Sequence, residues 1–252
     1  MGHPLDSSRL KLARAREHFR QLDVERKAFL DTQPYFYVPA YDDDAGRHEI
    51  RARVLAAPPL RLGVLAGDVI HNYRAALDHL VYQVAALGPR GEAGRGDRTQ
   101  FPIFEKKRDF DSHTATYLKG VPKEAVEVFE ICQPYMGGER LIGAIAALDD
   151  RDKHRVLAPV FSAPHAGRLR LVDGEASDVE SPSDLERIED GTVVCVYRTP
   201  PGVHRPAHFE LETTLVFGDP GVAAVSLTDL ANFGNFVDAV LLGFLPLFDR
   251  AT

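Results

Sequence analysis

The spacing of apolar and polar positions predicts helices over much of the chain. Apolar residues recur three or four positions apart in five segments, which are residues 6–31, 62–87, 122–131, 139–149 and 226–248. Asp6, Ser7 and Ser8 form a capping cluster for the first of these helices. Pro122 suits the first helical position of the third.

Alternation with a period of two predicts strands elsewhere. Residues 35–55 alternate on both sides of a turn rich in Asp, which is typical of a β-hairpin with one solvated face. Further strands are expected within about 156–217, at 156–161, 168–172, 193–199 and 208–217, with Phe209 and Leu215 facing inward and Glu210 outward. The pattern predicts an α+β fold, a helical bundle packed with an antiparallel β-sheet, in a single domain over residues 1–252.

The composition is that of a globular protein and narrows the function classes. Hydrophobic residues make up 44% of the chain and charged residues 27%, which argues against disorder. A net charge of −7 argues against a generic basic nucleic-acid binder. The charge is nevertheless uneven, because the first predicted helix is rich in Arg and Lys. That excess fits either a solvated helix face or a surface that meets a polyanion.

Targeting and redox features indicate a cytoplasmic protein with no membrane association. The first eight residues lack the basic and apolar regions of a signal peptide. The apolar stretch at 233–248 is short for a membrane span and contains Asn235, Asp238 and Pro246. Cys132 and Cys195 are the only cysteines, and their apolar neighbours predict buried free thiols.

The predicted helix at 62–87 has the most informative polar face. At about 100° per residue, one side of it carries two imidazoles, a guanidinium, a carboxylate, an amide and a phenol. The opposite side is apolar and is expected in the core. Solvated helix faces usually hold Lys, Glu and Gln, which are stronger helix formers, so the polar set is typical of a functional site. The polar residues are His71, Asn72, Arg74, Asp78, His79 and Tyr82, and the apolar ones are Val69, Ile70, Leu77, Leu80, Val81 and Val84.

The chemistry of this face favours an anionic substrate. Arg74 lies in its middle, and a fixed positive charge repels a metal cation. Arginine binds phosphate through two hydrogen bonds, and histidine exchanges protons near neutral pH. A second polar cluster at 149–155 includes Lys153, His154 and Arg155. These residues either extend the phosphate-binding surface or only cap the preceding helix.

The spacing Arg74-x-x-x-x-His79 resembles the R-x(4–6)-H motif of the HEPN superfamily, helical-bundle domains that include many metal-independent RNases. The resemblance implies RNA cleavage in which the 2′-hydroxyl attacks the adjacent phosphate. Arg74 would hold the phosphate and His79 would move the proton, with His71, Asn72 and Asp78 orienting them. It also implies a homodimer without metal or cofactor. The blocks 71–79 and 152–155 resemble segments of uncharacterised bacterial proteins as well, a likeness that implies no activity.

The leading hypothesis is therefore an endoribonuclease or related phosphodiesterase acting on RNA or another phosphate-bearing substrate. One alternative is a metal-dependent hydrolase with His71, Asp78 and His79 as ligands, joined by Asp152 or His154. Another is a non-enzymatic module that binds nucleic acid, a nucleotide or a protein. In a third, the polar face is a buried structural network. The remaining histidines considered, His113, His165, His204 and His208, are expected on the surface.

Overall fold

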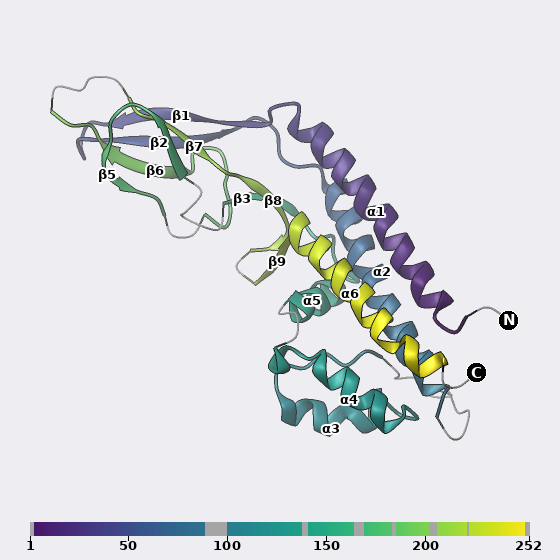
Figure 1. The fold of residues 1–252 in the computed structure, drawn as a ribbon. Helices are drawn as coiled ribbons and strands as arrows, with labels where there is room; N and C mark the ends of the chain where they lie inside the picture. Colours follow the sequence, from purple (N-terminus) through teal and green to yellow (C-terminus); the bar gives the residue numbers. More distant parts are fainter. Residues whose placement is uncertain are drawn as a thin grey trace. The chain divides into compact units, whose positions relative to one another are not determined.

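The computed structural model describes residues 3–88, 100–137, 141–163, 169–182, 185–201, 206–220 and 222–249 (Figure 1). Helices and antiparallel sheets in this part confirm the predicted α+β class. The chain divides into a helical unit, formed by Met1–Asp23, Gly63–Leu157 and Leu227–Thr252, and a sheet unit, formed by Val24–Leu62 and Ala158–Ser226. Each unit thus joins segments that are distant in sequence. The single-domain organisation stays a prediction.

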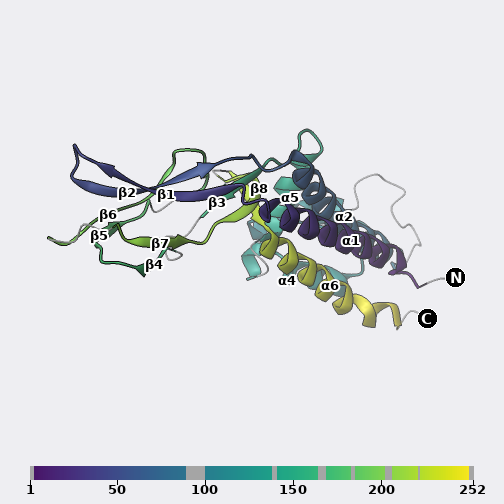
Figure 2. The same ribbon diagram turned by 90° about the horizontal axis from the view of Figure 1, so that it is seen from above.

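The long helices account for most of the helical unit, and two of them, α1 and α2, also contribute residues to the sheet unit. In this unit α1, α2 and α6 run side by side (Figures 1 and 2). Arg16 of α1 pairs with Asp238 of α6, and the Tyr73 ring of α2 packs on Phe233 of α6. The described helices are α1 (Asp6–Leu30), α2 (Leu60–Ala85), α3 (Lys107–Tyr117), α4 (Lys123–Ile131), α5 (Leu141–Asp152) and α6 (Leu227–Asp249), with a 3-10 turn, η1, at Pro134–Met136.

Helix α2 presents the predicted apolar face to the core. All six predicted core positions, from Val69 to Val84, are fully buried. Tyr73 lies on the same side, and its hydroxyl is so close to Gly234 of α6 that a Cβ there would overlap it. Burial raises the pKa of the Tyr73 hydroxyl to about 12. The small residue at 234 therefore sets how closely α2 and α6 approach.

Helix α6 is the most apolar of these helices. By length and composition it could cross a membrane, and it is the one helix in the described part of the chain that passes this test. Its buried side chains, among them Phe233, Val237 and Phe244, form part of the core of the helical unit. The core helix of a soluble protein has the same properties, so the absence of membrane association stays a prediction.

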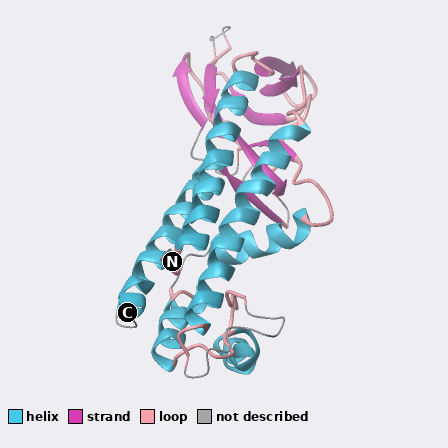
Figure 3. Ribbon diagram, turned by 90° about the vertical axis from the view of Figure 1, so that its right-hand side faces the viewer, coloured by secondary structure: helices cyan, strands magenta, loops and turns pink. Residues whose placement is uncertain are grey.

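The sheet unit holds three antiparallel sheets in its described residues, with strands drawn in magenta in Figure 3. Their strand orders are β1-β2-β6-β5, β3-β8-β9 and β4-β7. The predicted hairpin at 35–55 is confirmed, with β1 and β2 in register from Tyr35↔Val54 to Asp42↔Arg47. The strands are β1 (Tyr35–Asp42), β2 (Arg47–Val54), β3 (Pro159–Ser162), β4 (Leu169–Asp173), β5 (Ser177–Glu180), β6 (Val193–Arg198), β7 (His208–Leu211), β8 (Thr214–Asp219) and β9 (Ala223–Ser226).

Several strand predictions need correction. The predicted strand at 208–217 is two strands, β7 and β8, because its halves pair with different partners, β4 and β3. Phe209 and Leu215 are buried and Glu210 is exposed, as predicted, but the alternation does not extend through β8, where Val216 and Phe217 are buried as well. The strand expected at 156–161 begins only at Pro159. Strands β5 and β9 are not predicted from the pattern; every residue of β5 is exposed, which leaves no alternation to detect.

The helix predictions differ from the structure at three places. Helix α3 is not predicted, because Phe110 is the one buried residue among its eleven. Pro122 is the N-cap of α4 and not its first helical residue, since its ψ of 145° is extended. Helix α5 continues to Asp152, three residues past the predicted end at 149, so the charged cluster at 149–155 begins within the helix.

Both cysteines are free thiols, as expected. Cys195 is buried, but Cys132 is only half-buried. Burial raises the pKa of each thiol to about 11, which leaves little thiolate at neutral pH. Neither cysteine is therefore suited to act as a nucleophile.

Candidate functional site

The imidazole of His71 on α2 meets a buried carboxylate of α5. His71 Nδ1 lies 3.1 Å from Asp149 Oδ1. The His71 side chain is 56% exposed, whereas that of Asp149 is only 7% exposed. A carboxylate in this position favours the tautomer with the proton on Nδ1, which leaves Nε2 as the acceptor. His71 is therefore at the surface, and its hydrogen bond to the buried Asp149 fixes the orientation of its ring.

The second oxygen of Asp149 is bound to a lysine. Lys153 Nζ lies 3.1 Å from Asp149 Oδ2 and 3.7 Å from Asp150 Oδ1. Asp149 and Lys153 are four residues apart at the end of α5, so their side chains lie on one face. Both oxygens of the buried acid thus have a partner, as a buried carboxylate requires. This array of His71, Asp149 and Lys153 is called the His71 array below.

A glycine on α2 allows α5 to approach the array. The carboxylate of Asp152 lies against Gly67, where a Cβ would overlap it. Burial raises the pKa of Asp152, and the nearby negative charges of Asp68 and Asp149 add to that rise. Acidic groups therefore gather where α5 packs on α2, and the nearby His71 opposes the rise of the Asp152 pKa that they cause.

Arg74 and Asp78, on the same face of α2, bind a segment of the chain itself. Arg74 Nη2 donates to the carbonyl oxygen of Phe101 at 2.8 Å, and Asp78 Oδ1 accepts from the Phe101 N–H at 2.8 Å. The two side chains pair at 3.3 Å, and that of Arg74 is only 13% exposed. Burial raises the pKa of Asp78, and the Arg74 charge opposes this rise. We call this arrangement the Phe101 clamp.

The residues after Phe101 are fixed by a glutamine that the sequence does not single out. Gln133, fully buried after α4, donates from Nε2 to the Pro102 carbonyl at 2.9 Å and accepts from the Phe104 N–H at 3.0 Å. Residues 101–104 are thus hydrogen-bonded to α2 at one end and to Gln133 at the other. A single glutamine after a short helix carries no distinctive pattern, so no sequence signal would have found it.

The other predicted site residues are more dispersed. Asn72 Nδ2 donates to the Asp68 carbonyl within α2, so its amide is used by its own helix. His79 is half-buried, makes no hydrogen bond in the described part of the chain and is a neighbour of Asp78. Tyr82 is exposed one turn further along α2. His154 and Arg155 are exposed beyond the end of α5.

Two further expectations can be compared with the structure. Among the described residues, no group of three or more His, Cys, Asp or Glu is placed to hold a metal ion, so the metal-dependent alternative has no preformed ligand set there. His113 and His208 are exposed, as expected. His165 and His204 lie outside the described residues.

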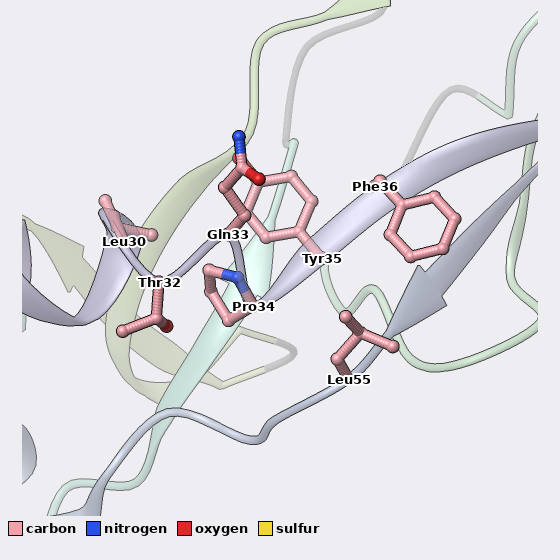
Figure 4. Close-up of a pocket in the computed structure, with 7 residues that line it drawn as sticks. All are labelled: Leu30, Thr32, Gln33, Pro34, Tyr35, Phe36 and Leu55. Atoms are coloured by element: carbon pink, nitrogen blue, oxygen red, sulfur yellow. The ribbon is translucent and has the colours of Figure 1, made fainter.

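A cavity in the sheet unit has a different character. It measures about 560 Å³ and lies where α1 ends and β1 begins (Figure 4). Its polar side chains are Thr32, Gln33 and the Tyr35 phenol, and none of its lining residues is an acid, a histidine or a cation. The rest of the lining is formed by Leu30, Pro34, Phe36 and Leu55. This cavity therefore offers no acid–base pair.

Comparisons with protein-family models, with curated proteins and with solved structures find no match. The HEPN resemblance and the homodimer that it implies stay predictions. Function is therefore inferred from the chemistry of the α2 face.

Proposed function

We propose that the helical unit carries a metal-independent acid–base site that cleaves phosphodiesters of RNA, with His71 as the proton-transfer residue. The observation that supports this most directly is the hydrogen bond between the exposed His71 imidazole and the buried Asp149 carboxylate. A base oriented by a buried acid is the arrangement that recurs where an enzyme activates a hydroxyl.

In the proposed reaction, His71 Nε2 accepts the proton of a ribose 2′-hydroxyl, whose oxygen attacks the adjacent phosphorus. The bond to the 5′-oxygen of the next nucleotide breaks, that oxygen takes up a proton from water, and the His71 imidazolium then returns its proton to solvent. The products are a 2′,3′-cyclic phosphate and a 5′-hydroxyl. Asp149 stabilises the imidazolium, and the exposed cations Lys153 and Arg155 stabilise the charge on the phosphate oxygens.

RNA is the favoured substrate class because it supplies its own nucleophile. Attack by the 2′-hydroxyl requires a base and positive charge; His71 is the proposed base, and Lys153, which pairs with the same Asp149, is a proposed source of the charge. Hydrolysis of DNA requires an activated water, a task that enzymes commonly give to bound metal ions. The described residues offer no ligand cluster for such an ion.

The proposal differs from the HEPN resemblance in its choice of residues. Arg74 donates to Phe101 and pairs with Asp78, and its side chain is only 13% exposed, whereas that of Lys153 is 52% exposed. His79 lacks an orienting carboxylate hydrogen bond in the described residues. His71 has that hydrogen bond and greater exposure, which is why it takes the role of base.

The test is cleavage of a mixed structured RNA by the full chain in excess EDTA. We expect wild type to leave 2′,3′-cyclic phosphate ends and His71→Ala to cleave about 10² to 10⁴-fold more slowly. That variant should stay folded, with a Tm lowered only by the loss of its hydrogen bond to Asp149. His79→Ala is the matched control and should retain most of the activity.

Other outcomes would replace the proposal. Loss of cleavage in His79→Ala, with His71→Ala active, would return the role to the Arg74 and His79 pair. Activity that requires added zinc or manganese would support the metal-dependent hydrolase. Binding of RNA without cleavage under either condition would support a non-enzymatic module.

A further inference from the structure

Three aromatic rings stack on one another with nearly parallel planes at α3, in the helical unit. The Phe104 ring centroid lies 5.1 Å from that of His113 and 5.8 Å from that of Tyr117, and the latter two are 5.8 Å apart. The interplanar angles of 24°, 16° and 17° make the rings nearly parallel. A column would place its outer rings about twice as far apart as neighbours, so these rings are arranged as a triangle. We call them the aromatic triangle.

The triangle is held in place by hydrogen bonds of the Phe104 backbone and of the His113 ring. The Phe104 N–H is bound by the buried Gln133, and His113 Nδ1 lies 2.7 Å from the Asp109 carbonyl one turn earlier in α3. His113 is exposed, whereas Phe104 and Tyr117 are half-buried. The rings are therefore preorganised and accessible from the His113 side.

Two lysines without ion-pair partners lie at the ends of the helix that carries two of these rings. Lys106 directly precedes α3 and Lys119 follows its end by two residues; both are exposed, and neither forms an ion pair within the described residues. Lys107, in contrast, pairs with Glu130 of the neighbouring helix α4 (Figure 1). An eleven-residue helix is about 16 Å long, so the two cations are spaced along it on the scale of a few nucleotides.

We propose that the aromatic triangle is a stacking platform for the bases of single-stranded RNA, with Lys106 and Lys119 contacting its phosphates. Every base presents a flat π-face, so stacking on aromatic rings recognises single strands with little sequence preference. Flanking lysines supply the phosphate contacts that such binding needs. The exposed His113 ring and the two lysines, which form no ion pair within the described residues, together match a base and its phosphates better than they match an apolar peptide.

Residues 101–104 connect the aromatic triangle to the helix that carries the proposed cleavage site. This segment is hydrogen-bonded to α2 at Phe101 and to Gln133 at Phe104. Phe101 is clamped by Arg74 and Asp78, which follow His71 on α2 by one and two turns. Phe104 lies three residues later, so the two ends of this segment are at most about 11 Å apart. The proposal rests on the proposed function for its choice of RNA, but the platform itself requires no cleavage.

The experiment measures binding of a short fluorescein-labelled single-stranded RNA by anisotropy, in the full chain carrying His71→Ala so that the RNA stays intact. Adding His113→Ala should weaken binding about tenfold, because a stacking ring is lost. Adding His113→Phe should restore it, because the ring returns without the imidazole. Thr116→Ala, at an exposed position of the same helix, is the matched control and should leave Kd unchanged.

The outcomes separate this proposal from the proposed function. Equal affinity for the His113→Ala and Thr116→Ala chains would overturn the platform, whatever the RNase assay shows. Weakening by His113→Ala with rescue by His113→Phe would support it, even if wild type cleaves no RNA. Failure of His113→Phe to rescue would overturn stacking as the cause, and tighter binding of duplex than of single-stranded RNA would overturn the choice of ligand.

Discussion

The polar face of α2 contains two arrangements that use similar residues for different purposes. In the Phe101 clamp, Arg74 and Asp78 bind both backbone groups of a neighbouring segment. In the His71 array, a buried carboxylate binds one nitrogen of an exposed imidazole and leaves the other open. The first arrangement stabilises the fold, and the second presents a reactive atom. The two arrangements differ in the partner of the polar side chains, which is a backbone segment in the clamp and a buried acid in the array.

The largest expected difference is between two aspartates on this surface. Asp149→Asn removes the charge that stabilises the imidazolium and weakens control of its tautomer, so kcat/KM on a short RNA in EDTA should fall about 10² to 10⁴-fold. Asp78→Asn keeps an acceptor for the Phe101 N–H and should change kcat/KM little. Comparable losses in both variants, at equal Tm, would mean that the two arrangements act as one site.

Stability should respond in the opposite order. Arg74→Ala leaves the Phe101 carbonyl and the Asp78 carboxylate without their partner, and we expect it to lower the free energy of unfolding by about 2–4 kcal/mol. His71→Ala leaves one oxygen of the buried Asp149 without its partner while Lys153 still pairs with the other, so we expect a smaller loss of about 1 kcal/mol. Urea denaturation of the two variants measures both values. A stable Arg74→Ala chain that has lost RNA cleavage would contradict the clamp.

The apolar–polar pattern of the sequence predicts which side of α2 is polar. It does not predict that this side contains two separate arrangements, the Phe101 clamp and the His71 array. Helical spacing places every predicted core residue correctly, because side-chain direction follows directly from the helix period. The sequence does not predict the partners of these side chains, because Phe101 lies 27 residues from Arg74 and Asp149 lies 78 residues from His71. One sequence carries no signal for such pairings. Asp149 is recognisable only as one member of a charged cluster.

Helix α3 shows a second limit of the sequence. With Phe110 as its one buried residue, it lacks the apolar stripe that identifies a surface helix. Without that helix, His113 and Tyr117 cannot be placed one turn apart, and the aromatic triangle is not foreseeable. His113 is correctly predicted at the surface, but its neighbours are not.

A smaller effect tests how α5 brings Asp149 to His71. Gly67→Ala places a Cβ against the Asp152 carboxylate, which should cost about 1–3 kcal/mol of stability and reduce RNA cleavage as Asp149 is displaced. Gly243→Ala in α6 is the control, because its Cβ meets open space; it should raise stability by up to about 1 kcal/mol. If Gly67→Ala is as well tolerated as Gly243→Ala, close packing at Gly67 does not position the His71 array.

The smallest effect concerns the pH dependence of stability near the same contact. Because burial raises the pKa of Asp152 above its ordinary value of 3.8, the folded state binds more protons than the unfolded state just above that pH, and stability falls as pH rises through this window. Asp152→Asn should remove that decline and raise Tm slightly at pH 7.

Glu210→Gln in the sheet unit is the control of opposite sign for that measurement. Arg170 lowers the pKa of Glu210, so this carboxylate favours the fold above its ordinary pKa, and the favourable contribution is lost as pH falls. Substituting Gln should therefore reduce the loss of Tm on acidification, weakly, because the pair is exposed. An unchanged pH profile in Asp152→Asn would mean that neither burial nor the charges of Asp68 and Asp149 raise the pKa of this carboxylate. The contact of Asp152 with Gly67 would then have no electrostatic influence on Asp149, the acid that orients His71.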